Sequence, residues 1–138
     1  MKTYDPKQVQ VIIGGVHIKG FMDGTFVSVK RNSDAFTTTV GADGEGTRVK
    51  SNDRSGTIEI TLAQSSISNE YLSNLLIADE ISNAGLVPAM VKDGSGKSLH
   101  VAEQAYVKKH PDSDHSKSVE GRTYIIETDN LSMFNGGN

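Results

Sequence analysis

The sequence predicts a mainly β fold, a β-barrel or β-sandwich with one α-helix after its central strand and one long polar loop. Several short runs alternate apolar and polar residues, as half-buried strands do. Glycine is frequent, with 14 among 138 residues, whereas tryptophan is absent and aromatic residues make up 6%. A single segment places apolar residues at helical spacing. We therefore expect seven or eight strands around one core, with the helix covering an end or a flank.

The expected strands differ in how clearly the sequence marks them. They span residues 8–13, 16–21, 25–31, 35–40, 56–62, a run beginning at 88–91, a run within 98–109, and 122–129. The Gly14–Gly15 link is typical of a tight hairpin between the first two. In the third, Phe26 is out of phase with the valines that follow it, which predicts a bulge or a strand with two apolar faces.

Two strands carry explicit predictions about the core. The run 56–62 is the clearest strand, and three of its residues are expected on one buried face: Ile58, Ile60 and Leu62. In the run within 98–109, four residues are expected to point inward: Leu99, Val101, Ala105 and Val107.

The helix is expected over residues 69–83. Tyr71, Leu72, Leu75, Leu76 and Asp79 fall at helical spacing. Ser68 is the expected N-cap, and Glu70 lies in the first turn, where the helix dipole favours an acid. Gly85 is expected to cap or follow the C-terminus.

The composition excludes several classes of protein. Cysteine is absent, which excludes disulfides, cysteine–zinc sites and a cysteine nucleophile, and is compatible with assembly in a reducing cytoplasm. The net charge of −3 argues against a broad basic surface for nucleic acid. Neither a secretory signal nor an apolar run of about 18 residues is present, so no membrane insertion is expected. A chain of this length suits one domain, residues 1–138.

The polar run from Thr38 to Thr57 fits neither a metal site nor a phosphate site. Its acids Asp43, Glu45 and Asp53 lack the alternating ligand pattern of a calcium loop. Its glycines are not followed by the Lys-Ser/Thr pair of a phosphate-binding loop or by a helix. Neither a metal nor a cofactor is expected here, and the glycines are interpreted as turn residues.

The second polar loop, His110–Gly121, and the remaining side chains give no catalytic pattern. His110 and His115 have only Asp112 and Asp114 nearby as further zinc ligands. No serine lies in a G-x-S-x-G motif, and no pair of carboxylates lies in a recognisable motif for general acid–base catalysis. The sequence therefore predicts no enzyme. Long polar loops and exposed strand edges favour a binding or assembly protein instead.

The order of these motifs resembles the tail tube proteins of contractile-tailed bacteriophages. The resemblance covers residues 4–76. It rests on the opening "PKQVQVIIGGVHIKGFMDG", then "VGADGE", a basic and polar link, "SGTIEITL", and the helix that follows. It implies closed rings, usually of six copies, stacked into a hollow tube inside a contractile sheath. Strands would join across subunits into an inner barrel that DNA passes through. Type VI secretion tubes and R-type pyocins share this fold, so a domesticated tail remains open.

The resemblance also implies partners and sites. Implied partners are further copies of the chain, the sheath, baseplate and tail terminator proteins, the tape measure protein, and transiting DNA without tight binding. The location implied is the virion, after assembly in the host cytoplasm. The loop Val40–Ser55 is expected to carry contacts between rings through its mixed charges: Asp43, Glu45, Arg48, Lys50, Asp53 and Arg54. Glu59, Glu127 and Asp129 are candidates for the lumen wall because they alternate with apolar neighbours, and acidic or neutral walls would repel phosphates.

The sequence leaves three alternative functions open. A tube initiator or terminator would share the fold and stop at a single ring. A β-domain that binds a small ligand or carbohydrate would use the two polar loops around a concave pocket. An enzyme is the third alternative, and no motif in the sequence supports it.

Overall fold

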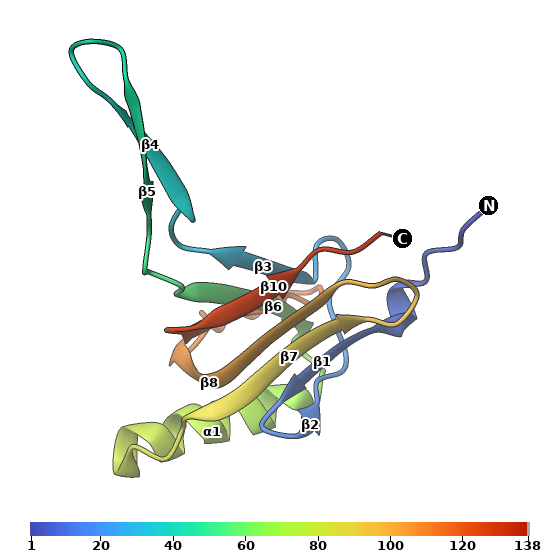
Figure 1. Cartoon of the computed structure of the whole chain (residues 1–138). Coiled ribbons are helices and arrows are strands. Elements are labelled where there is room, and N and C mark those ends of the chain that lie inside the picture. Colours follow the sequence, from blue (N-terminus) through green and yellow to red (C-terminus); the bar gives the residue numbers. More distant parts are fainter. Residues whose placement is uncertain (138) are drawn as a thin grey trace.

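The computed structural model describes residues 1–137, so the last residue of the expected domain, Asn138, lies outside the described part. The chain is mainly β with one α-helix, as expected (Figure 1). The strands are β1 (Val9–Ile13), β2 (Val16–His17), β3 (Val27–Arg31), β4 (Phe36–Val40), β5 (Gly46–Lys50), β6 (Gly56–Ala63), β7 (Val87–Asp93), β8 (Leu99–Lys109), β9 (Gly121–Thr128) and β10 (Leu131–Phe134). The helices are the short 3₁₀ helix η1 (Pro6–Gln8) and α1 (Ser68–Ser82).

Eight strands form one antiparallel sheet in the order β2-β1-β7-β8-β9-β6-β3, and β10 pairs with β8 beside this path. The remaining two strands, β4 and β5, pair only with each other. The long strand β8 pairs with β7 on one edge. On its other edge it pairs with β10 near its start and with β9 near its end. The sheet therefore folds over on itself, and its two halves enclose the core.

A bulge in β8 decides which of its residues face the core. Val87 pairs with Ala105 and Ala89 pairs with Ala102, so the spacing changes by one residue between the two strands. His100 and Ala102 are buried before this irregularity, and Ala105 and Val107 after it. The prediction for Ala105 and Val107 is thus confirmed. The prediction for Leu99 and Val101 is wrong, because strict alternation cannot be carried backward through a bulge.

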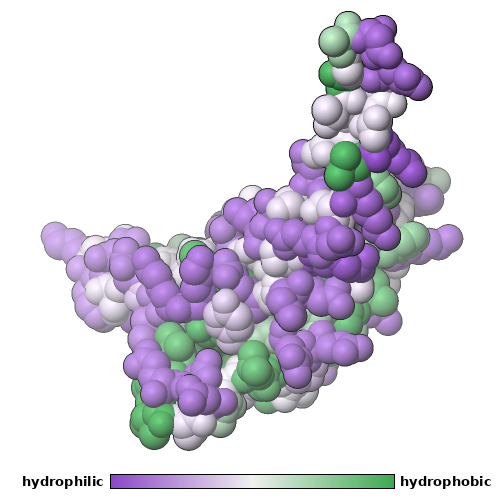
Figure 2. All heavy atoms as spheres, turned by 60° about the vertical axis from the view of Figure 1, so that its left-hand side comes forward, coloured by the Kyte–Doolittle hydropathy of each residue, from purple (hydrophilic) through white to green (hydrophobic). Residues whose placement is uncertain are grey.

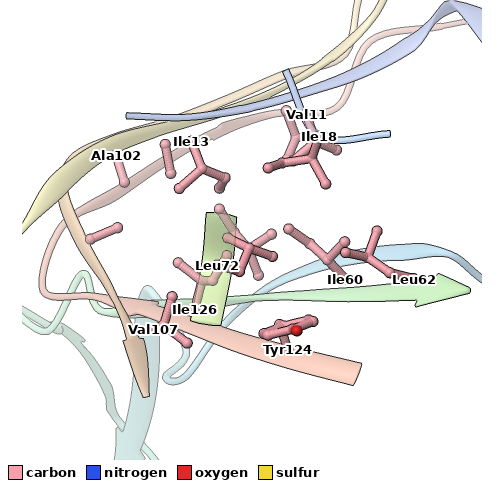
Figure 3. Packing of buried hydrophobic residues seen from close by; sticks show 14 of the residues in the cluster. Val11, Ile13, Ile18, Ile60, Leu62, Leu72, Ala102, Val107, Tyr124 and Ile126 are labelled. Atoms are coloured by element: carbon pink, nitrogen blue, oxygen red, sulfur yellow. The ribbon is translucent and has the colours of Figure 1, made fainter. Parts of the chain in front are cut away.

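The core lies between the two layers of the folded sheet. Figure 3 shows one layer contributing Val11, Ile13, Ile18 and Ala102, and the facing layer contributing Ile60, Leu62, Val107, Tyr124 and Ile126. Ile58, Ile60 and Leu62 are each at most 1% exposed, which confirms the predicted face of β6. Burying an aliphatic side chain of this size contributes about 1.5–3 kcal/mol relative to leaving it exposed.

The helix closes one side of this two-layered core. Leu72 and Leu76 of α1 are buried, and Leu72 lies between the layers (Figure 3). The Tyr71 hydroxyl donates to the Ile13 carbonyl over 2.9 Å. The Tyr124 hydroxyl, which is buried, donates to the side-chain oxygen of Asn69 over 2.9 Å. These two hydrogen bonds fix the helix to both layers.

The helix ends differ from the sequence-based expectation. Ile67 occupies the N-cap position without a side-chain hydrogen bond, and Ser68 is the first helical residue. The prediction of Ser68 as N-cap is wrong, because its Oγ accepts the Lys19 N–H over 2.9 Å instead. At the other end Asn83 takes the left-handed conformation, with φ 56°. Gly85 follows, and its N–H donates to the Asp79 carboxylate over 3.1 Å.

The segment after the Gly14–Gly15 turn is a shorter strand than expected. Only Val16 and His17 pair with β1, and then the chain crosses toward β6, where Phe21 forms an isolated bridge with Leu62. Phe26, which the sequence placed out of phase, precedes β3 and packs against Phe21 with ring centroids 5.0 Å apart. The crossing segment therefore ties the two layers together at one edge.

Candidate functional site: a projecting arm and a charged sheet face

The most prominent surface feature is a β-hairpin that projects from the body, termed the arm and comprising residues 35–51. Strands β4 and β5 pair from Phe36 with Lys50 to Val40 with Gly46, and all ten of their residues are exposed. Figures 1 and 2 show the arm extending well away from the rest of the molecule. The prediction of a loop after Val40 is wrong in this part, because residues 46–50 form a strand. Threonine and valine favour the extended backbone.

The arm tip, residues 41–45, is a tight acidic turn. The Gly41 N–H donates to the Glu45 carbonyl over 2.8 Å, and the Gly44 N–H donates to the Gly41 carbonyl over 2.9 Å. Gly44 has φ 87°, which a glycine adopts without steric cost. The Asp43 carboxylate accepts the Glu45 N–H over 3.1 Å. Asp43 therefore shapes the turn, and the tip presents two carboxylates to solvent.

The two faces of the arm differ in chemistry. Cross-strand pairing places Phe36, Arg48 and Lys50 on one face, where the Arg48 guanidinium lies 4.4 Å from the centroid of the Phe36 ring. The opposite face is uncharged and consists of Thr37, Thr39, Thr47 and Val49. The arm thus combines an acidic tip, a cationic face and a neutral β-branched face.

Asp53 and Arg54, the last two of the six residues predicted to make contacts between rings, hold the base of the arm. Asp53 accepts the Ser33 hydroxyl over 2.7 Å and the Ser55 N–H over 2.9 Å. Hydrogen bonds from Ser55 and Ser33 lower the pKa of Asp53 to about 2. Arg54 donates from Nε to the Asn130 side-chain oxygen over 3.1 Å. Asp53 and Arg54 therefore bond within their own chain, and the other four predicted residues lie on the arm itself.

Two of the three predicted lumen residues share one outward face of the large sheet. Glu59 of β6 and Glu127 of β9 both point away from the core side of their strands. The Lys30 Nζ lies 3.4 Å from the Glu59 carboxylate. Glu127 lies 3.0 Å from the Lys108 Nζ and accepts the Tyr106 hydroxyl over 3.3 Å. Partial burial and the charge of Glu127 raise the pKa of Tyr106. Each of these two predicted acids therefore has a lysine beside it, which local alternation in the sequence did not predict.

The third predicted lumen residue lies elsewhere. Asp129 follows the last residue of β9, in the bend before β10, and is exposed. Together with Glu103, Gln104 and Asn130 it lines a small groove of about 180 Å³. The alternation that placed Asp129 with Glu127 does not continue past the end of the strand.

Sequence reasoning missed a buried histidine at the open side of the core. His100 is 8% exposed, its Nδ1 has no hydrogen-bond partner, and burial lowers its pKa. It lines an opening of about 450 Å³ between β3 and the β1–β7 layer, together with Val9, Val29 and Val91. A prediction of the bulge in β8 would have placed His100 inward, but nothing local in the sequence marks that bulge.

The histidines of the second polar loop do not form a metal site. His110 lies 3.7 Å from the Glu80 carboxylate, and His115 contacts the Ser113 hydroxyl over 3.4 Å. Within residues 1–137, no group of three or more histidines and acids is placed to hold a metal ion. No helix in the same range is long and apolar enough to cross a membrane.

Comparison with known proteins identifies the family. A family model described as the bacteriophage PhiTE tail tube protein matches residues 9–134. The chain belongs to this tail tube family. A curated relative, structural protein ORF10 of Pseudomonas phage KPP10, is 35% identical over 144 residues, covering 99% of the chain and 83% of the relative. Both descriptions are of structural proteins and neither is of an enzyme, so this tail tube family member is a structural component of a phage tail.

Solved structures place the tail tube family member in the fold of contractile injection systems. The sheath–tube complex of the extracellular system PVC matches with TM-score 0.66 and 12% identity, over 96% of this chain and 91% of that one. The PVC sheath/tube terminator matches with TM-score 0.65 and 10% identity, over 98% and 99%. The tube-terminating cap of the anti-feeding prophage matches with TM-score 0.61 and 12% identity, over 97% and 92%. At these identities the likeness is one of fold.

Proposed function

We propose that residues 1–138 form one tube domain, and that the protein is the repeating subunit of the tail tube. Copies close into rings of six, and the rings stack into a hollow tube for DNA delivery. The observation that carries this proposal is the arm. Isolated two-stranded hairpins are marginally stable in water, and this one exposes Phe36, Val40 and Val49. A second molecule that covers the arm would stabilise it and bury this apolar surface.

The arm suits contacts between successive rings. The arm extends away from the body, so its tip and faces can reach another molecule (Figure 1). In the next ring they would meet a surface that differs from the arm. A contact between unlike surfaces does not close on itself and generates a filament. Four of the six residues expected to make these contacts lie on the arm: Asp43, Glu45, Arg48 and Lys50. Asp53 and Arg54 take part by holding its base.

Contacts within a ring would use the free edges of the large sheet. Strands β2 and β3 are the two ends of its strand order, so each has one edge without a partner strand among residues 1–137. Pairing such edges between copies extends the sheet around the ring and removes exposed edges that would otherwise aggregate. A sheet that continues through all subunits of a ring closes into a barrel, in which no strand edge stays unpaired.

The face that carries Glu59 and Glu127 is the proposed lumen wall, with Asp129 at its margin. Lys30 and Lys108 balance the two glutamates, so these four side chains together carry no net charge. Tight DNA binding requires an excess of positive charge near the phosphates. A wall in which these glutamates face lysines would let DNA and the tape measure protein pass without being held.

The remaining partners follow from the same role. The fold neighbours come from a sheath–tube complex and from terminators of such tubes. For this protein we propose the sheath on the outside of the tube, baseplate proteins at one end and a terminator at the other. The particle is assembled in the bacterial cytoplasm and the subunit remains in the virion tail.

Removal of the arm tests this proposal. The Ser51 N–H donates to the Ala35 carbonyl over 2.8 Å, so the two ends of the arm are already adjacent. Residues 36–50 can therefore be replaced by Asn-Gly, a natural two-residue hairpin turn. We expect a folded protein, shown by circular dichroism and a cooperative thermal transition. We expect it to form no tubes in negative-stain micrographs, whereas the intact chain forms rings and tubes. Normal tubes without the arm, or only monomers of the intact chain at all protein and salt concentrations, would overturn the proposal.

A tube terminator is the second candidate, because two of the three fold neighbours are a terminator and a cap. A terminator stops at one ring, and a purified particle would contain a single ring of copies. A tube subunit is present in many copies along the tail. Quantitative mass spectrometry of the particle, relative to its sheath protein, separates the two. The genes that encode the particle distinguish an infectious phage from a phage-like secretion or bacteriocin particle.

A further inference from the structure

A basic groove lies at the end of the molecule opposite the arm. Its volume is about 400 Å³, and its walls include Lys2, Thr3, Gly94, Ser95, Gly96 and Lys97. In Figure 1 the N-terminus and the turn between β7 and β8 lie on the far side of the body from the arm. Lys2 and Lys97 are both exposed. The groove therefore offers two ammonium groups over a surface of small residues. The Asp93 carboxylate accepts the Ser95 N–H over 3.0 Å but is not one of the residues that line the groove.

Three separate segments build this groove. The Gly94 N–H donates to the Gln8 carbonyl over 2.8 Å, which ties the β7–β8 turn to the N-terminal segment. The Asp5 N–H donates to the Ser95 hydroxyl over 3.4 Å. The Gly136 N–H donates to the Ser98 hydroxyl over 3.1 Å and brings in the C-terminal segment. The groove thus has a defined shape set by both ends of the chain.

The arm tip has the complementary chemistry. Residues 41–45 are three small residues and two acids, Asp43 and Glu45, in a tight hydrogen-bonded turn. We propose that the groove receives the arm tip of a second copy of this chain in the next ring. This inference rests on the proposed function, in which the arm contacts a neighbouring ring, and it names the surface that the arm meets.

The positions of the two surfaces suit stacking. Because the tip and the groove lie at opposite ends of the molecule, the arm of one copy cannot reach its own groove (Figure 1). A contact from the front of one copy to the back of the next repeats without closing, as a growing tube requires. Each exposed ion pair is weak, but a ring repeats the contact in every subunit, and complementary charge sets the register.

Engineered cysteines provide a direct test, because the chain has none of its own. Chains carrying Glu45→Cys are mixed with chains carrying Lys97→Cys and oxidised under tube-forming conditions. We expect a covalent dimer on a non-reducing gel. The matched control is Lys117→Cys, an exposed lysine of the second polar loop. Crosslinking no greater than in this control, in samples where micrographs show tubes, overturns the proposal.

Charge reversal provides a second, independent test. Glu45→Lys and Lys97→Glu each replace attraction by repulsion, and we expect each to raise the protein concentration needed for tube growth about tenfold at low salt. The double variant restores the pairing and should return to near the original value. Glu45→Gln separates loss of charge from reversal, and Lys117→Glu controls for the change in net charge.

The outcomes separate this inference from the proposed function. If removal of the arm abolishes tubes but the double variant is not rescued, the arm acts at another surface and the groove assignment is wrong. Single reversals without effect on tube growth also overturn the groove assignment. If tubes persist without the arm, both the contact between rings through the arm and its docking in the groove are wrong.

Discussion

At the scale of single residues, close packing can require one residue type at a position, and Gly56 is an example. Gly56 is buried where the chain returns from the arm into β6. A side chain there would collide with Leu131 and come within 3.0 Å of the Lys30 carbonyl. The glycine is therefore required by the contact between the start of β6 and β10, and not by an unusual backbone conformation.

Gly56→Ala should destabilise the protein by about 1–3 kcal/mol, because an added methyl group in a packed site forces its neighbours to move. Chemical denaturation monitored by circular dichroism measures this change. Gly46→Ala is the matched control, since its nearest neighbour would be the Thr38 methyl group at an ordinary 3.7 Å. Equal stability of the two variants would contradict the assigned role of Gly56.

His100 should make stability depend on pH. Burial lowers its pKa below the ordinary 6.5, so the unfolded chain takes up a proton at a higher pH than the folded chain does. The stability contributed by neutral His100 is complete above pH 6.5 and declines as the pH falls below that value. Urea unfolding between pH 7.5 and pH 5 should show this decline, and His100→Asn should reduce it. An identical decline in the variant would show that other groups are responsible.

At the scale of elements, the arm forms a strand pair although none of the residues in its strands is buried. Its backbone hydrogen bonds and the contact between Arg48 and Phe36 hold it together. The body anchors it through Asp53 and Arg54. The arm therefore contributes little to the core, and its sequence is free to serve contacts with other molecules.

Val49→Asp tests whether the uncharged face of the arm is covered in the assembled tube. The valine is 49% exposed in the single chain, so its replacement should leave the thermal midpoint nearly unchanged. Tube formation should fall, because an aspartate buried without a partner is costly. Micrographs and sedimentation measure the loss, and Thr47→Ser on the same face is the control. Unimpaired tubes would show that this face stays in solvent.

At the scale of the whole molecule, charge is distributed in a pattern that suits a passive channel. The chain has net charge −3, yet the proposed lumen face pairs each glutamate with a lysine. Two carboxylates, Asp43 and Glu45, lie at the arm tip, and two lysines, Lys2 and Lys97, line the opposite groove. These opposite charges lie where copies are proposed to meet, and not on the proposed lumen face.

The paired substitution Glu59→Lys and Glu127→Lys should convert the proposed lumen into a DNA-binding surface. Tubes should still form, because exposed ion pairs each contribute only about 0–1 kcal/mol. They should retain double-stranded DNA at low salt and release it as salt rises, since counterion release drives such binding. Co-sedimentation of DNA with tubes measures this. The Gln variants at both positions are the controls, and absence of salt-dependent retention would place this face outside the lumen.

The sequence by itself determined the elements whose signals are local. The alternation of Ile58, Ile60 and Leu62 predicted the buried face of β6, and helical spacing predicted α1. The polar residues and glycines of the segment after Val40 pointed to an exposed part of the chain, and the structure shows this segment exposed on the arm. These features follow from backbone periodicity and turn chemistry, which act over a few residues.

Only the tertiary structure decided the features that depend on distant residues. The bulge in β8 arises from its pairing with β7, and before it His100 and Ala102 face the core in place of Leu99 and Val101. The lysine partners of Glu59 and Glu127 lie 29 and 19 residues away in the chain. Pairing between strands is set by the fit of whole surfaces, so local sequence patterns do not specify which residues meet.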